Sequence, residues 1–396
     1  MMQKLLILCC IVLSSNVRLY AYDVPTVKDY SLVSVETLLK KCPDVDYAEF
    51  KGPTKFNYEP LPFSKFPQYQ PHIGTLDKTW VLTIPHGRVC SYDGYVLVNE
   101  KYMLRDTIPQ CEWFGSNLHL INGKGIQYNK VRKITGRVVV LARRFVSCYG
   151  HWIMDILGRL AMIEAMGIDY DYIYVPDDRK FQKESLQAWG IEPHKIIQPW
   201  GEFYYIEADE LIVPSSAVRV IPTPGQTFSG LIRLSGVYWP TWAIEYLRNK
   251  FLPLVNKNLH EQKFSKKVFI SRKDTNLRQM NNEDEAFKLL EAEGFERYEL
   301  GNLSFLEQVE LFSNADIVIG ANGSGLVNIM FCKPTTKVIE IFQARSDSTF
   351  YYLGQTLGLN YTCIKTMEFS SIEAFENTEI PIEIFHDVIK ILHDQK

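Results

Sequence analysis

Apolar residues in the first half of the chain form short runs, and these runs predict β-strands. The runs lie at residues 80–84, 95–99, 136–142, 171–175, 194–198 and 208–214. A stretch with helical spacing follows the third run, and strand and helix signals then alternate, which favours a parallel sheet with crossover helices. Residues 22–75 are rich in Pro, Lys and Tyr and show little period, so we expect a loosely structured entry segment there.

The second half of the chain has a clearer pattern of alternating strands and helices. Strands are predicted at residues 266–271, 297–300, 316–320 and 337–342, with a helix between each pair. Asn282 with Glu285 and Ser304 with Glu307 have the spacing of helix-capping boxes. The order β-α-β-α-β-α-β predicts a doubly wound lobe, and a final amphipathic helix is expected over residues 382–394.

Proline and glycine interrupt the pattern between residues 214 and 240, which indicates a link between two lobes. We therefore predict an N-terminal lobe over residues 22–240, with the linker from about 214, and a C-terminal lobe over residues 241–396. The 396 residues are enough for two hydrophobic cores. The fold class expected from the alternation is α/β.

The composition indicates a globular protein, since 46% of the residues are hydrophobic and 22% are charged. The net charge of −3 gives no reason to expect a nucleic-acid partner. At the start, Lys4 precedes an apolar run from Leu5 to Leu13, and small and polar residues follow. This pattern is typical of a signal peptide over residues 1–21, with an uncleaved anchor as the alternative, and predicts entry into the secretory pathway.

The chain contains eight cysteines, of which Cys9 and Cys10 lie in the predicted signal peptide. The other six are Cys42, Cys90, Cys111, Cys148, Cys332 and Cys363. An even number in an oxidising compartment favours some disulfide bonds, although the sequence does not choose the pairs. No C-x-x-C pair is present, so a zinc site is not expected. N-glycosylation sequons begin at Asn302, Asn322 and Asn360.

A glycine-rich stretch, GANGSGLVN at residues 320–328, lies where a predicted buried strand ends and a helix begins. Ligands of open α/β sheets bind at the carboxyl ends of strands, and a helix N-terminus offers free N–H groups to an anion. Glycine lets a phosphate approach the backbone closely. The alternative is a tight turn that needs glycine for its own geometry. The spacing fits neither the dinucleotide fingerprint nor the P-loop.

A basic loop, SRKDTNLRQMNN at residues 271–282, follows another predicted strand of the same lobe. Arg272 and Arg278 would lie at the same edge of the sheet as the glycine stretch, and arginine matches the geometry of phosphate. Together the two strand ends predict a nucleotide-diphosphate site; the alternative for the loop alone is a solvated basic turn. Glu340 is placed at the same edge. A carboxylate there is suited to accept hydrogen bonds from ribose hydroxyls, and the alternative is an ion pair with a neighbouring Lys or Arg.

A third feature is the stretch GHWIMDILGRL at residues 150–160. In a helix, His151, Asp155 and Arg159 fall on one stripe. An imidazole and a carboxylate on one face suit general base catalysis on a hydroxyl, and we expect Asp155 to be the base and His151 its partner, although the roles are exchangeable. The alternative is a capping histidine beside an Asp155–Arg159 surface pair.

These three stretches resemble glycosyltransferase family 61, because the motifs within His151–Leu160, Ser271–Glu283 and Gly320–Phe342 occur in the family's order. The resemblance implies a GT-B arrangement of two Rossmann-like lobes, the N-terminal one on the acceptor side and the C-terminal one binding the donor. It also implies inverting transfer from a nucleotide sugar, usually a UDP-sugar, to a glycan or glycoprotein acceptor, without a required metal or other cofactor. The donor residues it implies are Arg272, Arg278, Asn322, Gly323, Ser324, Gly325, Asn328 and Glu340.

The chain departs from this family's pattern at two positions and leaves two other functions open. The family often has His where this chain has Asn322, and Pro where it has Gly158. Asparagine does not shuttle a proton, so a protein that binds a glycan or nucleotide without catalysis is one alternative. A metal-dependent transferase is the other, because D-x-D runs occur at Asp44–Asp46 and Asp169–Asp171. The second run precedes a strand and therefore lies away from the ligand edge.

Overall fold

The computed structural model describes residues 30–59, 72–107, 131–143, 145–228, 231–255, 263–343, 348–366 and 377–393. The predicted signal peptide and Cys111 lie outside these ranges. The chain divides into two compact units. The N-terminal unit is formed by described residues within Tyr22–Lys257 and by Ser304–Leu306, and the C-terminal unit by those within Asn258–Leu303 and Glu307–Lys396. The first unit therefore includes the helix that begins at Thr241.

The C-terminal unit contains a parallel five-stranded sheet in the order β16-β15-β17-β18-β19. Its strands are β15 (Lys267–Ile270), β16 (Glu296–Tyr298), β17 (Ile317–Ala321), β18 (Lys337–Phe342) and β19 (Asn360–Lys365). The helices are α6 (Glu283–Ala292), η7 (Leu300–Asn302), α7 (Phe305–Asn314), η8 (Ser324–Phe331), α8 (Thr349–Leu357) and α9 (Ile382–His393). The α/β fold class and the doubly wound pattern predicted for this half of the chain are confirmed.

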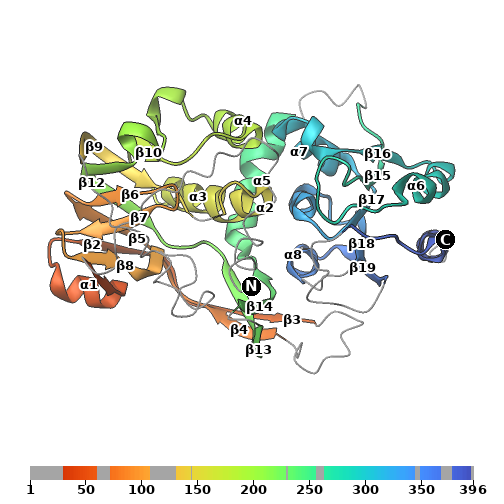
Figure 1. Cartoon of the computed structure of the whole chain (residues 1–396), viewed down its shortest axis with the longest axis horizontal. Helices are drawn as coiled ribbons and strands as arrows, with labels where there is room; N and C mark the ends of the chain where they lie inside the picture. Colours follow the sequence, from red (N-terminus) through yellow and green to blue (C-terminus); the bar gives the residue numbers. More distant parts are fainter. Residues whose placement is uncertain are drawn as a thin grey trace, which may run out of the picture. The chain divides into compact units, whose positions relative to one another are not determined.

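Helices cover both faces of this sheet (Figure 1). On one face, Phe269, Ile319 and Ile339 of the strands pack against Leu290 of α6 and Phe385 of α9. These strand residues alternate with neighbours that face the other way, as the two-residue period of a strand requires. The last helix is amphipathic, as predicted, with Phe385 and Val388 buried.

The strand order reverses beside β15, which places a topological switch point in the C-terminal unit. The chain runs from β15 to β16 on one side of the sheet and then returns to β17 on the other side of β15. In open parallel sheets, ligands bind outside the carboxyl ends of the strands at such a point. Here those ends lead into the basic loop after Ile270 and the glycine-rich stretch after Ala321.

The N-terminal unit contains a mixed ten-stranded sheet. Its order is β1-β8-β7-β6-β12-β9-β10-β11, with β5 beside β12 and β2 beside β5. The strands are β1 (Ser31–Val33), β2 (Asp46–Lys51), β5 (Thr79–Pro85), β6 (Arg88–Cys90), β7 (Tyr95–Val98), β8 (Tyr102–Leu104), β9 (Arg132–Val140), β10 (Tyr172–Tyr174), β11 (Ile196–Ile197) and β12 (Tyr205–Pro214). Each of the six runs predicted as strands therefore contains a strand, although residues 194 and 195 of the fifth run belong to a 3-10 helix.

Only part of this sheet has the parallel, helix-connected form that two Rossmann-like lobes require. Strands β12, β9, β10 and β11 run parallel, and helices connect β9 to β10 and β10 to β11. Strands β5 and β6 pair with β12, β6 with β7 and β7 with β8, all in antiparallel register. Tight turns explain the difference, because Asn99 and Glu100 both have φ of 51° between β7 and β8. Two residues with positive φ make the hairpin turn that joins antiparallel strands.

The helices of this unit are α1 (Val35–Lys41), η2 (Arg105–Thr107), α2 (Tyr149–His151), η4 (Trp152–Leu157), α3 (Gly158–Ala165), α4 (Lys180–Trp189), η5 (Pro193–Lys195), η6 (Gly201–Phe203) and α5 (Thr241–Val255). The segments α2, η4 and α3 follow one another without a break and form one helix. Its middle section, η4, has π-helical hydrogen bonding.

The expectation of a loosely structured entry segment is wrong for its described residues. Helix α1 begins after Ser34, whose hydroxyl accepts a bond from the Thr37 N–H. Strand β1 pairs with β8 and strand β2 with β5, while β3 (Thr54–Tyr58) and β4 (His72–Leu76) form a separate hairpin. Short strands without a strong period are stabilised by the partners they meet in the folded chain.

The predicted link over residues 214–240 contains regular structure as well. Strands β13 (Arg219–Phe228) and β14 (Leu231–Tyr238) form an antiparallel hairpin, with register shifts around Pro222. Proline has no N–H to donate to the ladder, which is why the pairing is interrupted there.

One local prediction is wrong for the described residues. Asn282 does not cap α6, because its side chain donates to the Ile380 carbonyl and accepts from the Ile380 N–H. Of the described cysteines, Cys42, Cys90 and Cys363 carry free thiols, and the expected disulfide bonds stay a prediction. Burial raises the pKa of the Cys90 thiol, so it behaves as a small apolar residue. Among the described helices, none has the length and apolar character needed to cross a membrane.

Candidate functional site

The basic loop after β15 is fixed by a buried carboxylate at the start of α6. Glu283 is almost fully buried, and its Oε1 accepts a hydrogen bond of 2.6 Å from the Ser271 hydroxyl. Its Oε2 accepts from the Arg272 backbone N–H at 3.1 Å. The Ser271 hydroxyl in turn accepts from the Lys273 N–H. The carboxylate thus ties the end of the strand to the first turn of the following helix and sets the direction of the loop.

Arg272 lies across the glycine-rich stretch. Its Nε and Nη2 donate to the carbonyls of Leu277 and Arg278 at 2.8 to 3.2 Å, so the guanidinium is held in one orientation. Its Nη1 lies so close to Gly323 that a Cβ there would be 1.9 Å from it. Gly323 has extended backbone, and it is the space for the guanidinium that requires glycine. The sequence prediction that these two stretches share one edge of the sheet is confirmed.

Arg278 reaches the same stretch from the other end of the loop. Its φ is +54°, in the left-handed region that few non-glycine residues adopt. Its Nη1 donates to the backbone carbonyl and the side-chain Oδ1 of Asn322, at 3.0 and 3.1 Å. The Asn322 Nδ2 donates to Glu340 at 2.8 Å. The side chain of Asn322 therefore connects the basic loop to strand β18.

Glu340 occupies the buried end of this chain of hydrogen bonds. It is fully buried, and its two oxygens accept from Asn322 and from the Tyr361 hydroxyl, both at 2.8 Å. Burial raises the pKa of Tyr361, and the nearby Glu340 raises it further, so the tyrosine remains a donor. A carboxylate in this position holds Asn322 in place and does not present a free oxygen to a ribose.

The remaining residues predicted for the donor site differ in exposure. Ser324 and Gly325 are partly exposed at the start of η8, where the Leu326 N–H donates to the Gly323 carbonyl. A Cβ on Gly325 would lie 2.7 Å from a methyl of Leu300, so this glycine allows η7 to pack against η8. Asn328 is fully buried, and its Nδ2 donates to Gln308 of α7. Asn328 therefore holds two helices together and lies away from the exposed edge.

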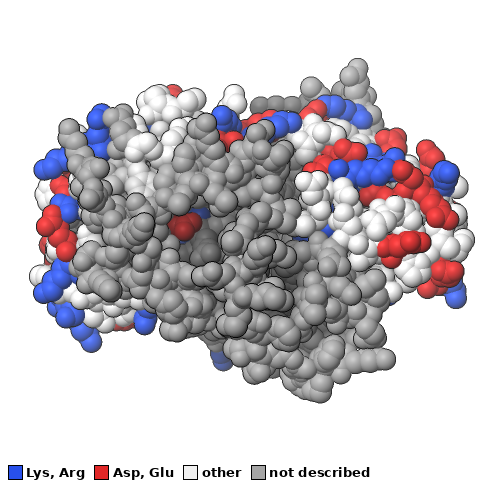
Figure 2. Space-filling model, in the orientation of Figure 1, with Lys and Arg blue, Asp and Glu red and all other residues white. Residues whose placement is uncertain are grey.

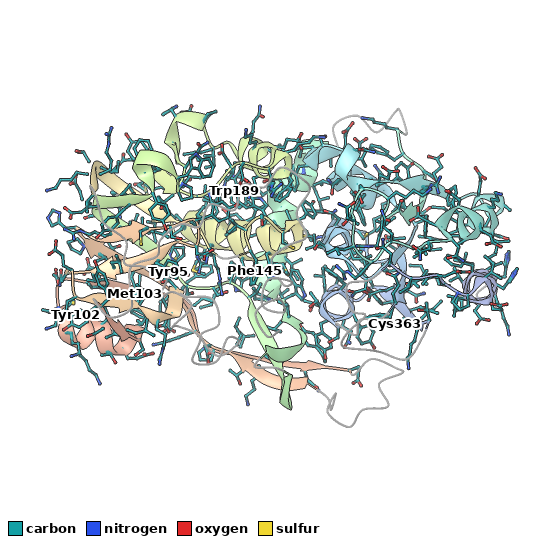
Figure 3. The ribbon with its side chains drawn as sticks, viewed as in Figure 1. Tyr95, Tyr102, Met103, Phe145, Trp189 and Cys363 are labelled. Carbon is teal, nitrogen blue, oxygen red and sulfur yellow. The ribbon has the colours of Figure 1, made fainter. Side chains whose placement is uncertain are left out.

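In the N-terminal unit, His151 and Asp155 lie side by side as predicted. The His151 Nδ1 is 3.3 Å from Asp155 Oδ2. The ring of His151 stacks on Phe145, labelled in Figure 3, with centroids 5.4 Å apart. Phe145 has a φ of +67°, a strained conformation that persists only where the surroundings impose it. Such strain and π-helical segments both occur often at functional sites.

The charges around this pair act on its two members differently. Burial alone would lower the pKa of His151, but the hydrogen bond to Asp155 raises it above the ordinary value. Burial would raise the pKa of Asp155, but Arg143 and His151 lower it to about 2. The Arg143 Nη1 lies 3.6 Å from Asp155 Oδ1, and the Ser216 hydroxyl donates to the same oxygen at 3.3 Å. Asp155 is therefore an ionised carboxylate with several partners at neutral pH.

Neither Arg143 nor Ser216 was predicted from the sequence, because Arg143 lies outside the helical motif and Ser216 lies 61 residues along the chain from Asp155. The glycine at position 158 was a partial signal in the sequence, because a glycine within a helix allows another segment to pack closely against it. A Cβ on Gly158 would lie 2.9 Å from the Cβ of Ala217, so glycine lets the segment after β12 reach the helix. Arg159 is 2% exposed, so the alternative of a surface Asp155–Arg159 pair is wrong.

The chain matches the family model Glycosyltransferase 61 over residues 149–339. This span begins with the helix of His151 and Asp155 and includes the basic loop and the glycine-rich stretch. Residues 149–339 of this chain are thus similar to glycosyltransferase family 61. The resemblance noted from the sequence is confirmed. Two residues lie just outside the matched span: Arg143, which contacts Asp155, and Glu340, which contacts Asn322.

Two relatives carry the same printed description, EGF domain-specific O-linked N-acetylglucosamine transferase. The mouse protein is 29% identical over 100 residues, which is 24% of this chain and 19% of the relative. The Drosophila melanogaster protein is 30% identical over 97 residues, 24% of this chain and 18% of the relative. The chain thus matches only about a fifth of the length of these relatives, and their activities do not transfer to it directly.

The described residues contain no group of three or more His, Cys, Asp or Glu side chains suited to a metal ion. Of the D-x-D runs, Asp171 uses its Oδ2 to accept the Arg137 backbone N–H at 2.8 Å. It lies at the start of β10, the amino end of the strand, as its position in the sequence predicts.

Proposed function

We propose that the protein is an inverting glycosyltransferase that moves a sugar from a nucleotide-sugar donor, a UDP-sugar, to a hydroxyl of a glycan or glycoprotein acceptor. The observation that carries the proposal is the position of Arg272, held over Gly323 at the switch point of a parallel sheet. The similarity of residues 149–339 to glycosyltransferase family 61 supports it. The secretory pathway is the compartment we propose, and the GT-B arrangement of the two units belongs to the same proposal.

The donor diphosphate would bind between the basic loop and the start of η8. Arg272 supplies a planar guanidinium whose orientation is already fixed, and η8 supplies backbone N–H groups around Ser324 and Gly325. Arg278 and Asn322 do not contact the diphosphate directly in this proposal, because their side chains are hydrogen-bonded to each other. They support the loop that holds Arg272. Glu340 is a positioning residue for Asn322 and not a ribose ligand in this scheme.

His151, rather than Asp155, is the base we propose. An ionised Asp155 accepts a hydrogen bond from the Nδ1–H of His151, which leaves Nε2 unprotonated and able to receive a proton from the acceptor hydroxyl. A pKa of about 2 makes Asp155 a poor base, since a general base works best with a pKa near the working pH. The acceptor oxygen forms the new bond to the anomeric carbon, the bond to the diphosphate oxygen breaks, and the proton passes to His151.

The test is a transfer assay with a panel of UDP-sugars and glycan or glycopeptide acceptors, run with and without EDTA. We expect transfer with inversion at the anomeric carbon, and we expect it to persist in EDTA. Transfer that stops in EDTA and returns with Mn²⁺ would favour the metal-dependent alternative. UDP binding without transfer to any acceptor would favour the binding protein that lacks catalysis.

A further inference from the structure

The cluster around Asp155 contains more positive than negative charge. Arg143 and Arg159 both interact with Asp155, and within the described residues no second carboxylate is among the main influences on the pKa of Asp155 or Arg159. Burial and the neighbouring Arg143 lower the pKa of Arg159 to about 9, while Asp155 acts against this shift. At neutral pH the described part of the cluster therefore holds two guanidinium groups against one carboxylate.

The excess charge is also short of hydrogen-bond acceptors. Within the described residues, Arg143 Nη1 and Arg159 Nε and Nη2 are buried and donate no hydrogen bond. Leaving a buried charged donor without an acceptor destabilises a fold, and an unbalanced buried charge does so strongly. An arrangement of this kind is stable when an anion completes it.

We propose that Arg143 and Arg159 form a subsite for an anionic group, a carboxylate or a phosphate, carried by the acceptor. The assignment to the acceptor rests on the proposed function, because the cluster surrounds the group that we propose as the base. A planar guanidinium presents parallel N–H donors that match the oxygens of either anion.

The exposure of the side chains indicates where the anion enters. The side chain of His151 is 31% exposed and that of Arg143 is 11% exposed, whereas Arg159 is buried. The anion would contact Arg143 beside His151, and the buried Arg159 would add positive charge. Arg143 sits at one end of a loop that is held in place, because Gln182 donates to the Val146 carbonyl at 3.0 Å.

The experiment measures binding of three probes to the full chain by calorimetry: glucuronate, inorganic phosphate and neutral glucose. We expect one or both anions to bind, and glucose to bind more weakly. Arg143→Gln should weaken anion binding by at least about tenfold, the loss of one charge-assisted contact. Arg137→Gln is the matched control, since it removes a partly exposed arginine of the same unit that pairs with Glu210, and it should leave the affinity for both anions unchanged.

The outcomes separate the possibilities. Binding of glucuronate that depends on Arg143 identifies a carboxylate, and binding of phosphate identifies a phosphorylated acceptor. Absence of binding by both anions, or equal affinity in Arg143→Gln and the wild type, overturns the subsite. A parallel loss of UDP affinity in Arg143→Gln would assign the anion to the donor and overturn the acceptor assignment. Should Arg143→Gln unfold, Arg143→Lys keeps the charge beside Asp155 but not the planar fork, and a measurable loss of anion affinity is expected.

A failure of the proposed function has a different signature. In that case no sugar is transferred from any donor, while the Arg143-dependent binding of the anion remains.

Discussion

Asp155 and His151 lie within hydrogen-bond distance of each other, yet their surroundings act on them in opposite directions. Arg143 and His151 hold Asp155 as an ionised carboxylate by lowering its pKa, and the hydrogen bond to Asp155 raises the pKa of His151. The pair resembles the carboxylate and imidazole of a catalytic triad, in which the carboxylate selects the tautomer and the imidazole takes the proton. The role of each residue follows from its neighbours, and the sequence alone left the two roles exchangeable.

The pH dependence of turnover tests this division. Because the base must be neutral, turnover should rise with pH through the raised pKa of His151 and level off above it. Asp155→Asn should lower turnover by at least about 10² and leave UDP affinity unchanged. In that variant the rising limb should also move to lower pH, because burial and Arg143 then act on His151 without Asp155, with only Cys148 still raising its pKa.

The measurement is kcat at saturating donor and acceptor across pH, alongside calorimetry with UDP. Near-normal turnover in Asp155→Asn would remove the pair from the mechanism. If turnover falls but the rising part of its pH profile does not shift, His151 is not the titrating group.

Replacement of Arg272 tests the donor site at the same scale. Arg272→Ala removes the guanidinium over Gly323 and should weaken UDP binding roughly tenfold or more, since a charge-assisted contact contributes about 1.5–3 kcal/mol. Lys266→Ala is a matched control, because Lys266 precedes the other end of β15 and pairs with Asp316 at the surface. Calorimetry with UDP compares the two variants. Equal affinity in both would exclude Arg272 from the site.

At the scale of the element, the helix of His151 depends on close contact with the segment after β12. Glycine normally destabilises a helix relative to alanine, so Gly158→Ala would ordinarily stabilise it. Here the added methyl would lie 2.9 Å from Ala217, and we expect a loss of about 1–3 kcal/mol from overpacking. Urea unfolding measures the change.

The double variant Gly158→Ala with Ala217→Gly provides the control. It should recover part of the loss, because the second change removes the methyl that the first one meets. A more stable Gly158→Ala protein would show that the contact has room to relax.

The elements that the sequence predicted well are those with a strong period or a long apolar run. The buried strands β15, β17 and β18 were predicted almost to their ends, because strands covered on both faces have continuous apolar sequences. The short strands β1 and β2 were missed, since each exists only through pairing with a strand that lies far along the chain. Local sequence carries little of that information.

The residues of the candidate site also divide into those that the sequence predicted and those that only the folded chain shows. Residues of continuous motifs, such as Arg272 and Gly323, were found because their spacing has a chemical meaning. Arg143 was missed because only the folded chain brings it to Asp155. Glu340 was found but given a role at the surface, since sequence position cannot show that Asn322 and Tyr361 already occupy its oxygens.

At the scale of the whole molecule, binding of UDP should stabilise the folded chain without a metal. A ligand at 100 times its Kd adds about 2.7 kcal/mol to the free energy of unfolding. We therefore expect UDP to raise the Tm by several degrees in buffer that contains EDTA, and uridine without phosphates to raise it less. Scanning calorimetry checks this result. A rise that needs added Mn²⁺ would contradict a donor site built from Arg272 and backbone N–H groups.

The surface of the molecule agrees with a small net charge. In Figure 2, basic and acidic side chains are interleaved over the described part of the C-terminal unit. On α6, Asp284 pairs with both Lys273 and Arg297. No single sign of charge dominates the described surface in this view, so we expect a modest effect of ionic strength on the rate of donor encounter.

The anchoring of Arg272 has a consequence for the thermodynamics of donor capture. A free arginine on a surface loses rotational freedom when it grips a phosphate, at about 0.5–1.5 kcal/mol for a side chain of this kind. The carbonyls of Leu277 and Arg278 have already immobilised this guanidinium during folding. Donor binding should therefore carry a smaller entropic penalty than binding by a freely moving surface arginine. Calorimetry of Arg272→Lys, whose flexible ammonium lacks those two anchors, should reveal the difference in the entropy of binding as well as in the affinity.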